Sequence, residues 1–319
     1  MSTSGNVAAV FAKEKIDLLY SSVLKTLLYY DLFRYPLTAE EIKSHCSYPD
    51  CSMRAVQEAL DELSEQELLF RYDQFYSLQN DRELFLRRIR GNEAVSQTMS
   101  KAQRRSKLIA SFPFVRCVCI SGSFSKNYFD ETTDLDFFII AEPNRLWICR
   151  TLLILFKKIF LLNSKKFFCV NYFIDSAHLR IPDKNIFTAT EIITLLPMYN
   201  YDMYLDFVSQ NDWMKSFFPN GHVRKENGVI KVSDSFVKRF TEKILSGKTG
   251  EWLDTFFYRQ TLNHWKKKFG WQPQNEFELN MRTRKTVSKH HPQGFQFQVL
   301  KKYEERIREF ENEHDLTLN

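Results

Sequence analysis

Apolar and polar positions in the first 80 residues recur at helical spacing in three stretches. The spacing predicts helices over 14–33, 39–46 and 52–69, because residues three and four apart fall on one face of a helix. Thr38 and Glu41 have the spacing of a capping box, which marks the start of the second helix. The chain therefore opens with three helices in close succession.

In the segment 69–78, apolar and polar residues alternate on either side of Asp73 and Gln74. This pattern predicts two short strands joined by a tight turn. Three helices and a hairpin resemble a winged helix-turn-helix domain, with 52–69 in the position of the recognition helix. The resemblance implies duplex binding, and a scaffold or dimerisation module is the alternative. That helix carries five acidic residues and one cation, Arg54, which favours a protein partner over phosphate contact.

Residues 81–111 contain eight Arg and Lys residues and predict a long basic helical linker. Two interpretations stay open for it. The cations form either a solvated charged face or a track for nucleic acid or nucleotide phosphates.

Two strongly apolar runs, 115–120 and 137–141, predict buried strands. The first run ends at a small-residue turn that contains Gly122 and Ser123. The second follows Asp134 and Asp136, whose side chains leave the same face of a strand because they are two residues apart. The sequence thus brings a glycine turn and a pair of carboxylates to the ends of two strands.

Paired carboxylates repel one another unless a cation lies between them, and hard oxygen ligands suit Mg²⁺ or Mn²⁺. Gly122 lets the backbone approach a phosphate, and the Ser123 hydroxyl can donate to phosphate oxygens. A helix starting at Ser125 would add a favourable dipole. Asp134 and Asp136 are therefore the candidate metal ligands, and Gly122 and Ser123 the candidate nucleotide-binding residues.

Gly122 and Ser123, ten intervening residues, and then Asp134-Leu135-Asp136 resemble the signature of the DNA polymerase β-type nucleotidyltransferase superfamily. The resemblance implies a small mixed sheet and an enzyme that transfers an NMP group from an NTP, with Mg²⁺ or Mn²⁺ bound by the two acids. The acceptor would be RNA, protein or a small molecule. The alternative is an inactive nucleotide-sensing or DNA-binding regulator that uses the winged helix.

The superfamily usually carries a third acid on a later strand, and the segment 167–175 predicts that strand. Alternation puts Cys169, Asn171, Phe173 and Asp175 on one face. Asp175 is the candidate third catalytic acid, and it could assist deprotonation of the acceptor. Two other interpretations stay open: Asn171 faces the metals and leaves a two-acid site, or Asp175 only opens the following turn.

Helices are expected over 186–215, and a basic cluster follows near residue 285. Lys285 and Lys289 are candidate ligands of the triphosphate or acceptor, by analogy with lysines that superfamily members place across the cleft. A solvated loop is the alternative. Adjacent side chains point apart, so His290 and His291 do not predict a metal site.

Composition narrows the class of protein. The net charge of +6 suits anionic partners, and six cysteines without a C-x2-C pair indicate reduced core thiols. The N-terminus lacks a signal-peptide pattern, and 146–162 is short and interrupted by cations, so we expect a cytoplasmic protein without membrane contact. The predicted class is α+β: a winged helix-like domain (1–80), a basic linker (81–111), a nucleotidyltransferase core (112–200) and a helical C-terminal domain (201–319).

Overall fold

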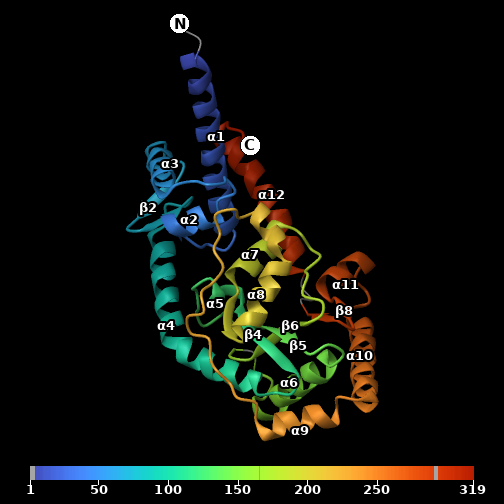
Figure 1. Ribbon diagram of the computed structural model, residues 1–319. Helices are drawn as coiled ribbons and strands as arrows, with labels where there is room; N and C mark the ends of the chain where they lie inside the picture. The colour runs from blue at the N-terminus through green and yellow to red at the C-terminus, as the bar shows by residue number, and fades with distance from the viewer. Residues whose placement is uncertain (1–3, 165, 291–293) are drawn as a thin grey trace.

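The computed structural model describes residues 4–164, 166–290 and 294–319, with side chains for 18–164, 166–274, 277–290 and 294–319 (Figure 1). The helices are α1 (Ser4–Asp31), α2 (Ala39–His45), α3 (Met53–Glu65), α4 (Arg82–Ala110), α5 (Gly122–Ser125), α6 (Leu146–Phe160), α7 (Ile186–Thr194), α8 (Tyr201–Gln210), the 3-10 helix η1 (Asp212–Ser216), α9 (Phe236–Ile244), α10 (Lys248–Phe269), α11 (Gln274–Asn280) and α12 (Phe295–His314). The strands are β1 (Leu37–Thr38), β2 (Phe70–Tyr72), β3 (Phe75–Ser77), β4 (Val115–Ser121), β5 (Asp136–Ala141), β6 (Cys169–Asp175), β7 (Leu196–Tyr199), β8 (Thr283–Arg284) and β9 (Val287–Lys289). This mixed content is consistent with the predicted α+β class.

The N-terminal part has the predicted order of three helices and a hairpin. The Thr38 side chain accepts from the Glu41 backbone at 3.2 Å, and the Glu41 side chain accepts from the Thr38 backbone at 3.0 Å, so the capping box is confirmed. Val56, Leu60 and Leu63 of α3 are buried, as their spacing predicted. The strand β1 pairs with β3, which gives a small sheet of order β1-β3-β2.

A six-stranded sheet of order β7-β4-β5-β6-β9-β8 forms the centre of the molecule. The strands β5 and β6 are parallel and are joined through α6, whereas β4 runs antiparallel to β5. Phe137 and Ile139 of β5 pack with α4 and α6, while Phe138 and Ile140 pack with α7 and α8. Helices therefore cover both faces of the sheet (Figure 1).

The central sheet differs from the sequence prediction in two places. The segment 186–215 was expected to be helical, but it contains the edge strand β7 between α7 and α8. The strands β8 and β9 come from the C-terminal third and extend the sheet beyond β6. Strands of two to four residues are too short to show the alternation by which a strand is predicted.

The linker helix α4 connects the N-terminal helices to the central sheet (Figure 1). Arg88 is 2% exposed, and its Nη2 atom lies 2.7 Å from Oε1 of Glu41. Its guanidinium also stacks over the Tyr35 ring, and Arg87 stacks over Tyr128. Arg82, Arg90 and Lys101 also contact side chains of the protein, namely Tyr72, Glu83 and Phe167. The two interpretations therefore stay open only for Arg104, Arg105 and Lys107.

The last helix returns to the first. Arg306 of α12 lies 3.3 Å from Asp31, and the Tyr303 hydroxyl donates to the carbonyl of Lys25. Figure 1 shows α12 beside α1. The first turn of α12 contacts the central part of the molecule through other residues, Phe295 against Phe187 of α7 and Gln296 against Lys289 of β9.

Two predictions from composition concern the interior. All six cysteines are free and buried, which confirms core thiols. The apolar segment near residue 150 forms the core helix α6, with Trp147 and Leu153 fully buried. Within the described ranges, no helix has both the length and the apolarity that crossing a bilayer requires.

Candidate functional site

The predicted glycine turn meets the second carboxylate at one end of the sheet. Ser121 at the end of β4 pairs with Asp136 at the start of β5, so Gly122 follows directly against that side chain. Gly122 has φ of +69°, and a Cβ atom there would lie 2.7 Å from Oδ2 of Asp136. The backbone conformation therefore favours glycine at this position, and any larger residue would also have to displace the Asp136 carboxylate.

The short helix α5 covers Gly122–Ser125 and then stops, so the helix expected to start at Ser125 is not formed. Asn127 adopts a left-handed conformation, and the Tyr128 backbone N–H donates to the carbonyl of Ser123. A left-handed residue with such a bond is a common helix terminus. The turn at Ser123 is thus closed by its own C-cap.

Asp134 and Asp136 leave the same face of the strand segment, as predicted. Leu135 and Phe137 are both buried in one core cluster, so the residues that alternate with them point the other way. The loop before Asp134 is fixed by Asp130, whose Oδ1 atom accepts from the backbone N–H groups of Thr132 and Thr133.

Asp136 is partly buried among other acids. Burial is the main cause that raises its pKa to about 6, and the charges of Asp134 and Glu191 raise it further, against a hydrogen bond from Cys169. Its Oδ1 atom also accepts from Nδ2 of Asn171 at 3.2 Å. A carboxylate that is expensive to ionise would be stabilised by a bound cation.

The structure does not bring Asp175 to this site. Asp136 pairs with Cys169, whereas Asp175 pairs with Ala141 at the opposite end of β5. The predicted alternation also fails, because a β-bulge at Asn171 shifts the register of β6. Asp175 is buried and accepts from the His178 ring at 2.7 Å and from the Ala177 backbone at 3.1 Å, so it opens the following turn.

The neighbour of Asp136 on β6 is therefore Asn171, the alternative that the sequence left open. A second acid comes instead from α7. Lys126 Nζ lies 2.7 Å from Oε1 of Glu191 and 3.1 Å from the carbonyl oxygen of Gly122, which connects this acid to the glycine turn. Sequence reasoning missed Glu191, although it is the one charged residue of α7 and lies on an otherwise apolar and neutral helix.

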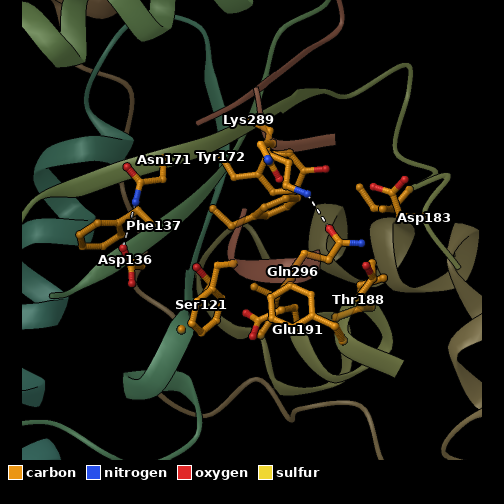
Figure 2. Close-up of a pocket in the computed structure, with 18 of the residues that line it drawn as sticks. Ser121, Asp136, Phe137, Asn171, Tyr172, Asp183, Thr188, Glu191, Lys289 and Gln296 are labelled. Atoms are coloured by element: carbon orange, nitrogen blue, oxygen red, sulfur yellow. Dashed lines mark hydrogen bonds between the residues drawn. The ribbon is translucent and has the colours of Figure 1, made fainter. Parts of the chain in front are cut away.

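A cavity of about 270 Å³ lies beside this group of residues. Gly122, Asp136, Asn171, Glu191 and Lys289 all line it, whereas Ser123 and Asp134 do not. Figure 2 shows Asp136 and Asn171 on one side of the cavity, with Lys289, Gln296 and Asp183 on the other.

The two candidate lysines have different positions. Lys289 is buried on β9 opposite Tyr172, and its Nζ atom donates to Oε1 of Gln296 at 2.7 Å. Lys285 lies outside the cavity lining and forms an ion pair of 2.8 Å with the buried Asp254. Asp254 also accepts from the first backbone N–H groups of α6, so Lys285 stabilises the packing of that helix.

Asp134 and Asp136 could hold a divalent cation only if other ligands complete its coordination. Among the described residues, no three His, Cys, Asp or Glu side chains could hold a metal ion by themselves. Mg²⁺ is usually held by one or two carboxylates, with water and substrate phosphates as the other ligands. Asp134 and Asp136 supply such a pair. His290 lies 5.0 Å from the Trp265 ring, and His291 lies outside the described residues.

No protein-family model, no curated protein and no solved structure matches this chain.

Proposed function

We propose that this chain is a metal-dependent nucleotidyltransferase that moves an NMP group from an NTP to an acceptor. The observation that carries the proposal is the contact between Gly122 and Asp136. A glycine in a left-handed conformation lets the backbone lie close to Asp136, a carboxylate whose pKa is raised and which is therefore costly to ionise in the folded protein. This arrangement is useful where a phosphate and a metal ion must lie between a backbone turn and a pair of acids.

The arrangement of strands supports a polymerase β-like core. The glycine turn ends β4, the two acids begin the antiparallel β5, and α6 crosses over to the parallel β6. The pairing of β1 with β3 likewise supports a winged helix in the N-terminal part. The exposed face of α3 carries Glu58, Asp61 and Glu65, with Arg54 paired to Glu58, which favours a protein partner over DNA.

The proposed reaction assigns a task to each side chain. The acceptor oxygen attacks the α-phosphorus, the bond from that phosphorus to the bridging oxygen breaks, and pyrophosphate leaves with the electron pair. A bound Mg²⁺ ion would neutralise charge on the phosphates. Gly122 and Ser123 would donate to phosphate oxygens, Asp134 and Asp136 would hold the ion, and Glu191 is the nearby carboxylate that can take the acceptor proton.

One observation favours a second candidate, a nucleotide-sensing regulator without turnover. Asn171 stands where the superfamily usually carries a third acid, and an amide does not accept a proton as a general base. A regulator needs nucleotide and metal binding but no base. Glu191 separates the two candidates, because only the enzyme needs a carboxylate that receives a proton, and the ion pair of Glu191 with Lys126 would have to open for that step.

The test is transfer of label from each NTP with Mg²⁺ or Mn²⁺, in the presence of cellular RNA or of a small-molecule extract. The Asp134→Ala/Asp136→Ala variant should lose transfer, whereas Asp202→Ala/Asp206→Ala, which removes two exposed acids of α8, should keep it. Metal-dependent NTP binding without transfer in any mixture would support the regulator. Absence of both binding and transfer would refute the proposal.

A further inference from the structure

Lys289 is a buried cation without a dedicated counter-ion among the described residues. Its side chain is on the wall of the cavity and is 7% exposed, and its one hydrogen-bond partner there is the neutral amide oxygen of Gln296. The carboxylates of Asp183 and Glu191 are both close enough to act on its charge. Each already forms an ion pair of 2.7 Å with another cation, Asp183 with Arg282 and Glu191 with Lys126. Burial lowers the pKa of Lys289 to about 8.

A buried ammonium group is costly unless an anion compensates it, and an ammonium has three N–H donors. Gln296 accepts one of them at 2.7 Å. The remaining donors can bind an anionic group that enters the cavity. A nucleobase is neutral and would leave the charge uncompensated, so the Lys289 end suits a different ligand.

The rest of the wall is mainly apolar. Side chains from the sheet, from α7 and from α8 form it, namely Phe138, Tyr172, Phe187, Ile192 and Phe207. Phe295 closes the cavity against Phe187, with ring centroids 5.8 Å apart. Sites for small ligands combine such apolar walls with a few placed polar groups.

The size and place of the cavity limit its occupant. Its volume of about 270 Å³ lies just below the usual range for drug-sized ligands, which begins at about 300 Å³. It starts at Asp136 and Asn171 and extends away from Ser123 and Asp134, which do not line it. Gly122 and Asp136 line one end of the cavity, so a triphosphate bound at the glycine turn would occupy that end and leave the Lys289 end for a second molecule.

We infer that this cavity holds the acceptor of the proposed nucleotidyl transfer, a small molecule with an aromatic or apolar body and one anionic group that binds Lys289. The inference rests on the proposed function and excludes a nucleic-acid strand or a protein as the acceptor. The acceptor hydroxyl lies at the Asp136 end, where its oxygen bonds to the α-phosphorus, pyrophosphate leaves, and the proton passes to Glu191.

The experiment measures binding of para-hydroxyphenylpropanoate, which has a ring, a hydroxyl and a carboxylate, by ligand-observed NMR. Its amide serves as the uncharged control, and a single-stranded RNA oligonucleotide as the polymer control. The variants are Lys289→Met and Lys301→Met, the latter an exposed lysine of α12. Binding of Mg²⁺-NTP to the same proteins and to Asp134→Asn is measured in parallel.

We expect the carboxylate to bind the wild type about tenfold more tightly than the amide does, the effect of one hydrogen bond to a charged group. Lys289→Met should remove that difference and keep Mg²⁺-NTP binding, and Lys301→Met should change neither. Equal binding of carboxylate and amide to the wild type would overturn the inference without use of any variant. Loss of Mg²⁺-NTP binding in Lys289→Met, or displacement of the carboxylate by RNA, would also overturn it.

The two proposals fail in different ways. If Asp134→Asn keeps full Mg²⁺-NTP binding, the proposed function is refuted, while binding of the carboxylate at Lys289 remains a separate result. If Asp134→Asn loses Mg²⁺-NTP binding, but para-hydroxyphenylpropanoate binds the wild type and Lys289→Met equally well, only the acceptor inference is refuted.

Discussion

Asp136→Asn removes a charge that the folded protein holds at a cost. The pKa of this carboxyl is raised from 3.8 to about 6, mainly by burial and then by the charges of Asp134 and Glu191. Such a rise corresponds to about 3 kcal/mol against the charged form, and partial access of water reduces it to about 1–2 kcal/mol. An asparagine keeps an oxygen for the hydrogen bond from Asn171. We therefore expect the variant to be more stable than the wild type, although it should be inactive.

The sign of the effect follows from proton binding. Between about pH 4 and pH 6 the folded protein binds the Asp136 proton more tightly than the unfolded chain does, so wild-type stability falls as pH rises through this window. The gain of Asp136→Asn should be full above about pH 6 and should vanish below about pH 4. Urea denaturation of both proteins across this range measures it, and the rise in Tm should be on the order of 2–4 °C.

Two further measurements make the test decisive. Excess Mg²⁺ with NTP should stabilise the wild type and leave Asp136→Asn unchanged, because only the carboxylate binds the ion. Asp202→Asn, an exposed acid of α8, serves as the control for a change in net charge. A variant that is no more stable than the wild type at any pH would show that Asp136 is not strained, and the electrostatic argument for the metal site would then be wrong.

Three other changes have defined outcomes. Gly122→Ala should cost about 1–3 kcal/mol in thermal unfolding and lower NTP transfer at least about tenfold, because of the positive φ and the clash with the carboxylate beside it. Asn171→Asp should tighten Mn²⁺ binding, measured by calorimetry, and lower Tm without metal, since it adds a third acid. Lys285→Met should keep NTP binding but cost about 2 kcal/mol in urea denaturation, since it leaves the buried Asp254 without its ion pair.

The sequence predicts those helices and strands that depend on residues close together in the chain. The capping box at Thr38 and the strands on either side of the glycine turn follow from residue spacing within a few positions, and the structure has them there. The same holds for the common face of Asp134 and Asp136, which needs only that Leu135 point into the core. Each of these depends on contacts between residues close in the chain.

The rest of the site depends on packing between distant segments. Alternation puts Asn171 and Asp175 on one face of the strand, and the bulge at Asn171 breaks this relation between them. Glu191 reaches the glycine turn because α7 packs across the sheet, which no local pattern encodes. Lys285 and Lys289 are alike in sequence, but β9 pairs with β6 in a register that buries only Lys289 in the cavity.

The perturbed groups of this cavity differ from the ion pairs that stabilise the fold. Arg116 lies 2.6 Å from Glu142 and 2.9 Å from Glu242, so each charge there has an opposite charge beside it. In the cavity the pKa of Asp136 is raised and that of Lys289 is lowered, which means that each group resists its charged form. Ionisable groups shifted in opposite directions across one cavity are typical of a binding or catalytic site, because a ligand can supply the missing charges. A metal ion at one end and an anionic group at the other would compensate both.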